Sequence, residues 1–578
     1  MSVFFSLAAL ITALLFVLTT RLEILKGAPN NFTFGFYVAA KFVVGYLWGV
    51  FIFNIVLLDT TFLAYIKSLA IFIAAAMIWE STWSISKSKK NFAVYYFLPG
   101  VCTAAAFLIL VIFYPMTIAD QKFNAANGSL SKEKNLEATD EKHLPVVGDD
   151  YAEYVAKREL STWKKNISYF ELGYGIKQSI NGTLYYVYPI EYRGYSKWLK
   201  GQPVPGFIKV NAENPNAEAE FVKSDMRYVP SAYFNDNVSR MVRKKNPTTL
   251  LMDPSFEIDD QNHPFYVVPY GHFEALRNIR IVDGAILVDP KTGEQKKYET
   301  KDVPKFVDQI IPTDIAFERM QWYGEYREGG WFNANGLLGT GILASQTGVV
   351  EPTDWGDADS VFGLYDKANQ LSWFSDFTNP TSDSDTMVGF AMMNARNGKI
   401  DYYENVSGVS GSDAKGVSQK GTLKAEDLKG NVRGLFQIYG QPTWLVSLED
   451  KSGVYRYTAF VNVKDAQVYA YAKDVNEALN NYETAIATGM TGQNASASKD
   501  AKESVISGSV VSVYKREVKD KTMVQFLLDN SDKIFTVTAS EYPYAMFIET
   551  GHRLNLTYID TKNINVSVKS LKDITLKK

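Results

Sequence analysis

The sequence predicts an N-terminal four-helix transmembrane domain, an α+β ectodomain of repeated helix and antiparallel-strand units, and a small C-terminal β-barrel. Three observations predict this fold class. Nearly every long apolar run lies before residue 115, and most charged residues follow it. One short turn motif recurs four times between residues 210 and 466. After residue 505, short β-branched and aromatic runs follow one another closely, which is typical of a small barrel.

The first domain, residues 1–116, contains four apolar segments, each close to the ~20 residues that a helix needs to cross a bilayer. They run from Val3 to Thr20, Phe34 to Leu58, Phe62 to Trp83 and Phe92 to Tyr114. The first segment does not fit a secretory signal, because no basic residue precedes it and no small-residue cleavage site stands before Arg21. We therefore expect a multi-pass cell-membrane protein whose first partner is the lipid bilayer.

Basic residues in the short loops predict the orientation, since Lys and Arg are retained on the cytoplasmic side. The first loop carries Arg21 and Lys26, the third carries Lys87, Lys89 and Lys90, and the second, near Asp59, has neither Lys nor Arg. The N-terminus and the ectodomain are therefore expected to be extracytoplasmic. The single cysteine, Cys102, lies in the fourth segment, so the ectodomain forms no internal disulfide, as is compatible with an exported bacterial domain.

Composition divides the remainder of the chain. Residues 117–148 are polar and almost free of aromatics, which predicts a flexible linker. Residues 149–487 hold the repeated units, and residues 488–504 are a spacer rich in Gly, Ser and Ala. Residues 505–578 contain six strand-like runs, including "AMFIE" from Ala545, and predict a barrel of the OB or SH3 kind.

The recurring motif is a hairpin turn. Its first polar residue is Asn211, Asp289, Asn394 or Asn462, and each follows an apolar run: "GFIKV", "GAILV", "GFAMM" or "YTAFV". Asp or Asn can bond its own backbone to start a turn, and Gly293 and Gly398 can supply the positive φ that closes it. We therefore interpret these residues as structural and not as ligands.

Further similarity lies upstream of the turns. Helices are expected at Tyr151 to Trp163, Ala232 to Lys245 and Asp314 to Arg327, ahead of units one to three. A buried strand is expected before three of the hairpins, at "LYYVYP", "PFYVVP" and "PTWLVS", whereas the third unit has no clear match. The predicted unit is a helix, a strand and then a hairpin.

The stretches "HPFYVVP" and "ILVDPKTGE" resemble the PepSY module, a small exported α+β unit whose last hairpin carries a V-D-x-x-T-G-x-V turn. More broadly, "PGFIKV", "MRYVPSAYF", "GQPTWLVSL" and "YTAFVNV" are similar to a largely uncharacterised bacterial and phage family of multi-pass membrane proteins with tandem PepSY-like repeats. The resemblance covers about residues 150–485. It implies architecture, together with an association with extracytoplasmic binding and with restraint of proteases.

No motif for catalysis, cofactor or metal stands out. The four histidines are His143, His263, His272 and His552, and none lies in a nucleophile motif. Zinc at His263 and His272 would need two further ligands. Asp354, Asp357 and Asp359 lack the spacing of a calcium-binding EF-hand loop. We expect no catalytic residue, no metal site and no cofactor.

Two charged residues inside the predicted membrane helices need an explanation. Lys41 and Glu80 lie at similar depth in neighbouring antiparallel segments. They either pair within the bilayer or extend their charged groups to the interface. Two such charges do not define a transport path.

These features favour a non-enzymatic membrane protein that presents an extracytoplasmic binding or scaffold domain to an envelope protein or glycan. The alternative is a regulator or inhibitor of an extracytoplasmic protease or cell-wall enzyme, and a transporter is less favoured. An aromatic cluster, Trp322, Tyr323, Tyr326 and Trp331, either packs in the core or stacks on a ligand. The formal net charge of −3 gives no reason to expect nucleic acid, and a homo-oligomer is compatible with the sequence.

Overall fold

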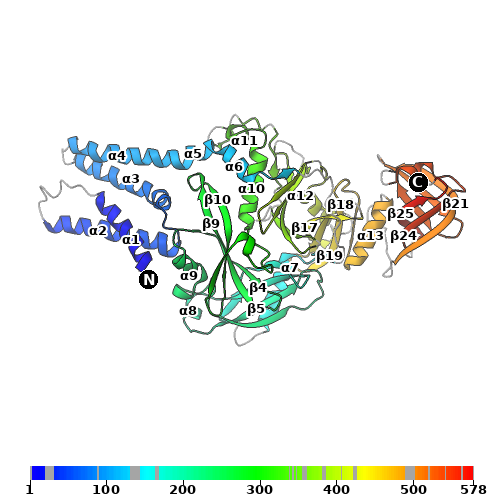
Figure 1. The fold of residues 1–578 in the computed structure, drawn as a ribbon, viewed down its shortest axis with the longest axis horizontal. Helices are drawn as coiled ribbons and strands as arrows, with labels where there is room; N and C mark the ends of the chain where they lie inside the picture. Colours follow the sequence, from blue (N-terminus) through cyan, green and yellow to red (C-terminus); the bar gives the residue numbers. More distant parts are fainter. Residues whose placement is uncertain are drawn as a thin grey trace.

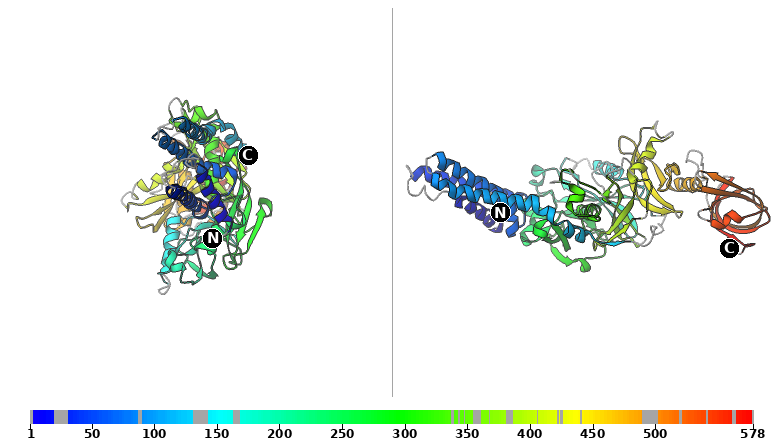
Figure 2. Two further views of the ribbon diagram at one scale, coloured as in Figure 1. Left: turned by 90° about the vertical axis from the view of Figure 1, so that its left-hand side faces the viewer. Right: turned by 90° about the horizontal axis from the view of Figure 1, so that it is seen from above.

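The computed structural model places helices, sheets and a barrel in a row along the long axis of the molecule (Figures 1 and 2). It describes the chain except residues 1–2, 20–30, 87–89, 131–142, 163–167, 337–338, 342–343, 347, 354–360, 367, 381–385, 405, 421–422, 424–425, 440, 489–501, 519–520, 540–541, 561–563 and 577–578. The apolar helices project from one end of the sheet-rich part, and the barrel lies at the other end.

The N-terminal helices form two antiparallel hairpins (Figure 1). Helix α1 spans Val3–Leu18, and α2 (Asn31–Val50) continues through the π-helical turn η2 (Phe51–Ile55). Helix α3 spans Phe62–Ser86, and α4 (Lys90–Leu108) continues through η3 (Ile109–Phe113) into α5 (Tyr114–Thr117). All four predicted segments are thus mainly helical where the structure describes them, and the second ends at Ile55 rather than Leu58.

Two of these helical stretches are long and apolar enough to cross a membrane, Gly35–Ile55 and Phe97–Thr117. Helix α3 reaches that length only if its parts Phe62–Ala70 and Phe72–Ser81, which are bent by 46°, count as one span. The apolar stretch of the first helix, Ser6–Leu18, is shorter. By length and composition, two of the four predicted spans are therefore supported. The other two helices are apolar as well, but one is bent and the other is short.

The sheet-rich part repeats one topology four times, as a helix followed by a four-stranded antiparallel meander. In unit one, α7 (Asp149–Ser161) precedes β3 (Ile176–Ile180), β4 (Thr183–Tyr192), β5 (Val204–Asn211) and β6 (Glu220–Met226). In unit two, α9 (Val238–Lys245) precedes β8 (Ser255–Ile258), β9 (Pro264–Glu274), β10 (Ile279–Val288) and β11 (Gln295–Glu299).

In unit three, α10 (Thr313–Tyr326) precedes β13 (Phe362–Tyr365), β14 (Leu371–Thr378), β15 (Gly389–Asn394) and β16 (Ile400–Tyr403). In unit four, α12 (Gly411–Lys415) precedes β17 (Lys429–Ile438), β18 (Gln441–Glu449), β19 (Tyr455–Asn462) and β20 (Tyr469–Ala472). Short strands extend three of the sheets: β2 (Phe170–Leu172), β7 (Leu250–Leu251), β12 (Glu351–Pro352) and β1 (Ser129–Leu130). Other short helices are α8 (Tyr195–Trp198), α11 (Trp331–Asn335) and η4 (Phe234–Asp236).

The third unit therefore has the upstream strand that its sequence did not reveal. Strand β14 pairs with β15 from Ser372 to Phe377, as β4 pairs with β5 in unit one. Ser375 and Asp376 are fully buried within β14, which breaks the apolar pattern that marks the other three strands. Packing decides this strand where local hydrophobicity does not.

The four units share a core. Phe374 of unit three and Trp444 of unit four meet edge to face at 5.9 Å between ring centroids. Phe207 of unit one and Phe256 of unit two do the same at 5.5 Å. All four side chains are at most 2% exposed. The sheets therefore bury apolar faces against one another, and the largest core cluster has residues from all four units.

The predicted flexible linker, residues 117–148, is structured where it is described. Helix α6 (Ala119–Ala126) packs on α10, and β1 runs parallel to β16. Leu144, Val146 and Val147 are almost fully buried, and the Val147 amide donates to the Ala212 carbonyl at 3.0 Å. The prediction of a flexible linker was wrong for the described residues, because the few apolar side chains of this polar segment pack against the sheets. Residues 131–142 lie outside the described part.

The C-terminal part is a closed five-stranded barrel with strand order β21-β22-β23-β25-β24. Its strands are β21 (Lys502–Val518), β22 (Lys521–Leu528), β23 (Ile534–Thr538), β24 (Arg553–Asp560) and β25 (Asn565–Asp573). Helix α13 (Val475–Thr488) precedes it, and most of the predicted spacer is not described. One of the six predicted strands is wrong, because "AMFIE" lies mainly in the 3-10 helix η10 (Pro543–Phe547), where Ala545 is fully buried.

Candidate functional site

The four repeated turns have one geometry. In each, the side-chain oxygen of the first polar residue accepts hydrogen bonds from the backbone amides two and three residues later. The acceptor is Asn211 for Glu213 and Asn214, Asp289 for Lys291 and Thr292, Asn394 for Arg396 and Asn397, and Asn462 for Lys464 and Asp465, at 2.7–3.2 Å. Gly293 and Gly398 adopt φ of 74° and 72°. These side chains are occupied by turn formation.

We expect Asp289→Ala to weaken the β10–β11 hairpin by about 1 kcal/mol, because two backbone amides lose their acceptor. Hydrogen exchange of the full-length protein should show the amides of β10 and β11 exchanging several-fold faster. Gly293→Ala should act in the same direction, since an added Cβ would lie 2.8 Å from the Tyr228 ring at a left-handed φ. Lys291→Ala is the matched control within the turn, and an equal effect there would contradict this account.

The structure brings Lys41 and Glu80 together between α2 and α3. Lys41 Nζ lies 2.6 Å from Glu80 Oε1 and 3.0 Å from Thr19 Oγ1, and the Tyr37 hydroxyl donates to Glu80. The side chains of Lys41 and Glu80 are 13% and 2% exposed. The sequence left two alternatives, an ion pair within the bilayer or extension of each charge to the interface, and the structure shows the ion pair. An unpaired charge at this depth would cost a few kcal/mol.

The loop between α2 and α3 is joined to the sheets by a buried ion pair. Arg277, at the tip of the β9–β10 hairpin, donates through Nη1 and Nη2 to Asp59 Oδ1 and Oδ2 at 2.9 and 2.7 Å. The side chains are 11% and 4% exposed. Burial raises the pKa of Asp59, but the hydrogen bonds from Arg277 and Thr61 and the Arg277 charge outweigh it and hold that pKa below its ordinary value.

The tip of the β9–β10 hairpin, which carries Arg277, has a strained backbone. Ala275, Leu276 and Arg277 have φ of 45°, 50° and 70°, a left-handed turn without glycine. Such residues cost about 1 kcal/mol or more each. The Asn278 side chain holds the turn by donating to the Ala275 carbonyl at 2.8 Å. The contact with Asp59 offsets this strain, so the tip and the loop stabilise each other.

Helix α9 completes the same contact, which we call the loop junction. Arg243 Nε donates to the Leu57 carbonyl at 2.9 Å, Arg240 donates to the Asn54 carbonyl, and the Thr60 amide donates to the Pro247 carbonyl at 2.9 Å. Carbonyls at the C-terminal end of a helix lack intrahelical partners and attract cations. Burial lowers the pKa of Arg243 to about 10, against the opposing charge of Asp59. The end of the η2 turn is thus capped by two arginines of the sheet-rich part.

A second contact, the helix junction, joins the continuation of α4 to unit three. Lys122 of α6 lies over the rings of Trp322, Tyr326 and Trp331 at 5.4, 5.8 and 5.6 Å from their centroids. The Tyr402 hydroxyl donates to the Ala126 carbonyl at 2.8 Å. The aromatic cluster considered as a ligand platform therefore encloses a lysine of the chain itself.

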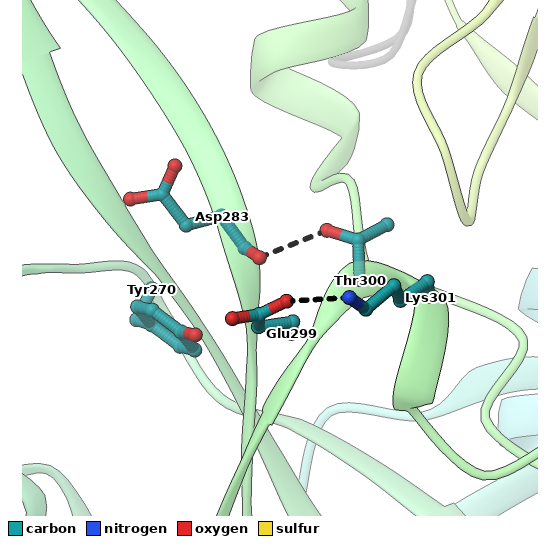
Figure 3. A pocket seen from close by; sticks show the side chains of 5 residues that line it. All are labelled: Tyr270, Asp283, Glu299, Thr300 and Lys301. Carbon is teal, nitrogen blue, oxygen red and sulfur yellow. Dashed lines mark hydrogen bonds and ion pairs between the residues drawn. The ribbon is translucent and has the colours of Figure 1, made fainter.

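An open hollow of about 510 Å³ lies beside β10 and β11 and is lined by Tyr270, Asp283, Glu299, Thr300 and Lys301 (Figure 3). Lys301 pairs with Glu299 at 3.2 Å, and Thr300 Oγ1 donates to the Asp283 carbonyl at 3.0 Å (Figure 3). Its charged groups are thus already paired, Lys301 with Glu299 and the Asp283 carboxylate with His272.

The histidines considered for zinc lie apart. His263 precedes β9 and contacts Asp259 at 3.1 Å, whereas His272 lies near the other end of β9 and contacts Asp283 at 2.9 Å. Hydrogen bonding to Asp283 raises the pKa of His272. Among the residues that the structure describes, no group of three or more His, Cys, Asp or Glu could hold a metal ion. Asp354, Asp357 and Asp359 lie outside the described residues.

A buried polar network, which no motif in the sequence predicts, joins units one, two and three. Glu257 of β8 is fully buried and accepts from the Asp308 amide at 2.7 Å. The Asp308 carboxylate accepts from the Ser179 amide at 2.8 Å and lies 3.0 Å from the Tyr365 hydroxyl. Burial raises the pKa of Glu257 to about 8, with repulsion from Asp308 adding to it, and burial raises the pKa of Asp308 to about 7. Both carboxyl groups are therefore neutral near pH 5.

The structure combines two helices of membrane-spanning length with a large, mostly antiparallel sheet-rich part and a barrel. This architecture is consistent with a membrane protein. The sequence matches no protein-family model, and no curated protein matches it significantly.

Asp59, Arg277 and Arg243 were not found from the sequence. The available signal was an acid in the apolar loop "LLDTTFL", which has no basic neighbour. It shows that Asp59 needs a partner, but nothing local identifies Arg277, which is 218 residues away.

Proposed function

We propose that this protein is a non-enzymatic, multi-pass membrane protein that holds an extracytoplasmic binding domain at a fixed position on the bilayer. The observation that carries the proposal is the loop junction, in which Arg240, Arg243 and Arg277 attach the tandem sheets to the end of the apolar helices. The helix junction adds a second attachment through α6. A domain fixed in this way suits a scaffold for an envelope protein or a glycan.

The repeated unit supports the alternative role, regulation of an extracytoplasmic protease or cell-wall enzyme. Four meanders, each preceded by a helix and carrying the same Asp or Asn turn before its last strand, support a tandem arrangement of PepSY-like units. At the C-terminus, the long strand β21 pairs with β22 through one half and with β24 through the other, which supports the OB alternative over the SH3 one.

Two measurements test the proposal. Tyr174, 84% exposed on unit one, is replaced by Cys in a Cys102→Ala background and treated with a membrane-impermeant maleimide on intact cells. Labelling without permeabilisation is expected, and labelling only after lysis would place the sheets in the cytoplasm. Purified full-length protein is then assayed on peptidoglycan and peptides. Turnover that a single Asp or His substitution abolishes would refute the non-enzymatic role.

The two binding roles are separated by affinity purification from cross-linked membranes. A regulator is expected to recover one hydrolase in near-stoichiometric amount, whereas a scaffold is expected to recover a structural protein or glycan strands. A transporter would instead show flux that Glu80→Gln removes.

A further inference from the structure

Four aromatic rings gather on the sheet-rich part beside the loop junction. Tyr195 and Trp198 of α8 contact Tyr233 and Phe234, with ring centroids 5.1–6.4 Å apart. Tyr195, Tyr233 and Phe234 are 47%, 37% and 58% exposed, and the adjacent Leu199 is 63% exposed. We call Tyr195, Trp198, Leu199, Tyr233 and Phe234 the aromatic patch.

The patch lies at the level where the apolar helices end. Phe234 begins η4, which leads directly into α9, and Arg240 and Arg243 of α9 donate to carbonyls of Asn54 and Leu57 at the end of α2 and η2. In Figure 1, α8 and α9 form the edge of the sheet-rich part nearest the ends of α1 and α2. The patch is therefore continuous with the surface from which the membrane-length helix Gly35–Ile55 emerges.

Its chemistry fits a bilayer interface. Tyr and Trp have an apolar body and a polar tip, and they concentrate at the headgroup level of membrane proteins. Lys197 and Lys200 border the patch, with Nζ atoms 5.1 and 5.0 Å from the Tyr169 ring centroid, and Lys244 and Lys245 are exposed on α9. Lysines on such a rim attract anionic headgroups.

We propose that the aromatic patch inserts into the headgroup region of the leaflet on which the sheet-rich part lies, and that the surrounding lysines bind anionic lipid. The patch is then a third attachment of the domain, made to lipid and not to the helices.

Depth measurement by electron paramagnetic resonance tests this. Leu199→Cys and Phe234→Cys, each in the Cys102→Ala background, carry a nitroxide in full-length protein reconstituted at one copy per nanodisc of phosphatidylcholine and phosphatidylglycerol. The expected ratio of oxygen to nickel-chelate accessibility is several-fold above that of Tyr174→Cys, an exposed control on unit one. Replacing Lys197 and Lys200 by Gln should lower the ratio in these discs and not in discs of phosphatidylcholine alone.

A label on the native Cys102, which is exposed on α4, reports whether the helices enter the bilayer. If Cys102 is in hydrocarbon while Leu199→Cys and Phe234→Cys match the control, the lipid contact is refuted and the membrane anchoring of the proposed function stands. If the Cys102 label is also in water, both the lipid contact of the aromatic patch and the membrane anchoring of the proposed function are refuted. Dipolar broadening between labels in discs that hold two copies would show that a second copy covers the patch, and would overturn the proposal.

Discussion

Arg277→Met is expected to destabilise the loop junction by about 3 kcal/mol, because it leaves the buried Asp59 carboxylate without its bidentate partner. Hydrogen exchange of the full-length protein in nanodiscs should become roughly a hundredfold faster at residues 56–61 and at the β9–β10 tip. The left-handed turn at Ala275 to Arg277 should relax as well, since the contact that offsets its strain is gone.

Two controls make this result specific. Arg456→Met breaks an ion pair with Asp450 whose side chains are 50% and 23% exposed, and it should cost no more than about 1 kcal/mol. Adding Asp59→Asn to Arg277→Met should recover most of the loss, because the amide carries no charge and its oxygen can still accept from the Thr61 amide. Equal effects of Arg277→Met and Arg456→Met would contradict the assignment of the junction as a buried pair.

Acid should open the same junction. The pKa of Asp59 is lower in the folded protein than in the unfolded chain, so its contribution is present above the unfolded value near pH 4. This stabilisation by Asp59 is lost as the pH falls through the pKa that Asp59 has in the folded protein. Exchange at residues 56–61 should therefore rise in acid in the wild type and should change less in the Asp59→Asn, Arg277→Met double variant.

Glu257→Gln is expected to stabilise the sheet-rich part at pH 8 by on the order of 2–4 kcal/mol and to leave it unchanged at pH 5. The folded-state pKa of Glu257, about 8, is above its unfolded value of 4.5. Folded protein therefore holds an extra proton between these values, and the wild type loses stability as the pH rises from about 4.5 to 8. Glutamine has no proton to lose, so it avoids this loss.

The local geometry permits the glutamine. Its side-chain oxygen can accept from the Asp308 amide as the glutamate does, and its nitrogen can donate to Ser255 Oγ, which lies 3.3 Å from Glu257 Oε1. Exchange of the β8 and β3 amides at pH 5 and pH 8, corrected for intrinsic rates, measures the effect. Glu299→Gln on β11, whose side chain is 69% exposed, is the control and should show no such pH dependence. A pH-independent difference for Glu257→Gln would contradict the prediction.

The hairpin turns show how far the sequence leads. Asn211, Asp289, Asn394 and Asn462 each bond amides two and three residues away, so the whole interaction is contained in one short segment and recurs wherever the segment does. The helices of the first domain are also local, since a continuous apolar run decides them. The barrel was predicted by strand density, although one of its six expected strands proved to be a 3-10 helix.

Some errors arose where a segment's partner lies far along the chain. Helix α6 was taken for a linker because its residues are polar on average, while Lys122 and Phe123 find aromatic partners about 200 residues later. Strand β14 was not recognised because Ser375 and Asp376 interrupt its apolar pattern. The neighbouring strands β12, β13 and β15 supply the pairing that makes it a strand.

By itself the sequence determined the elements whose cause lies within a few residues: the apolar helices, the four turns and the density of strands before the C-terminus. The tertiary structure alone decided the loop junction, the network of Glu257 with Asp308, and the position of the aromatic patch beside the helix ends. The physical reason is that a buried charge or ring is stabilised by whatever folding brings within a few ångströms. For Asp59 that group is Arg277, 218 residues further along the chain.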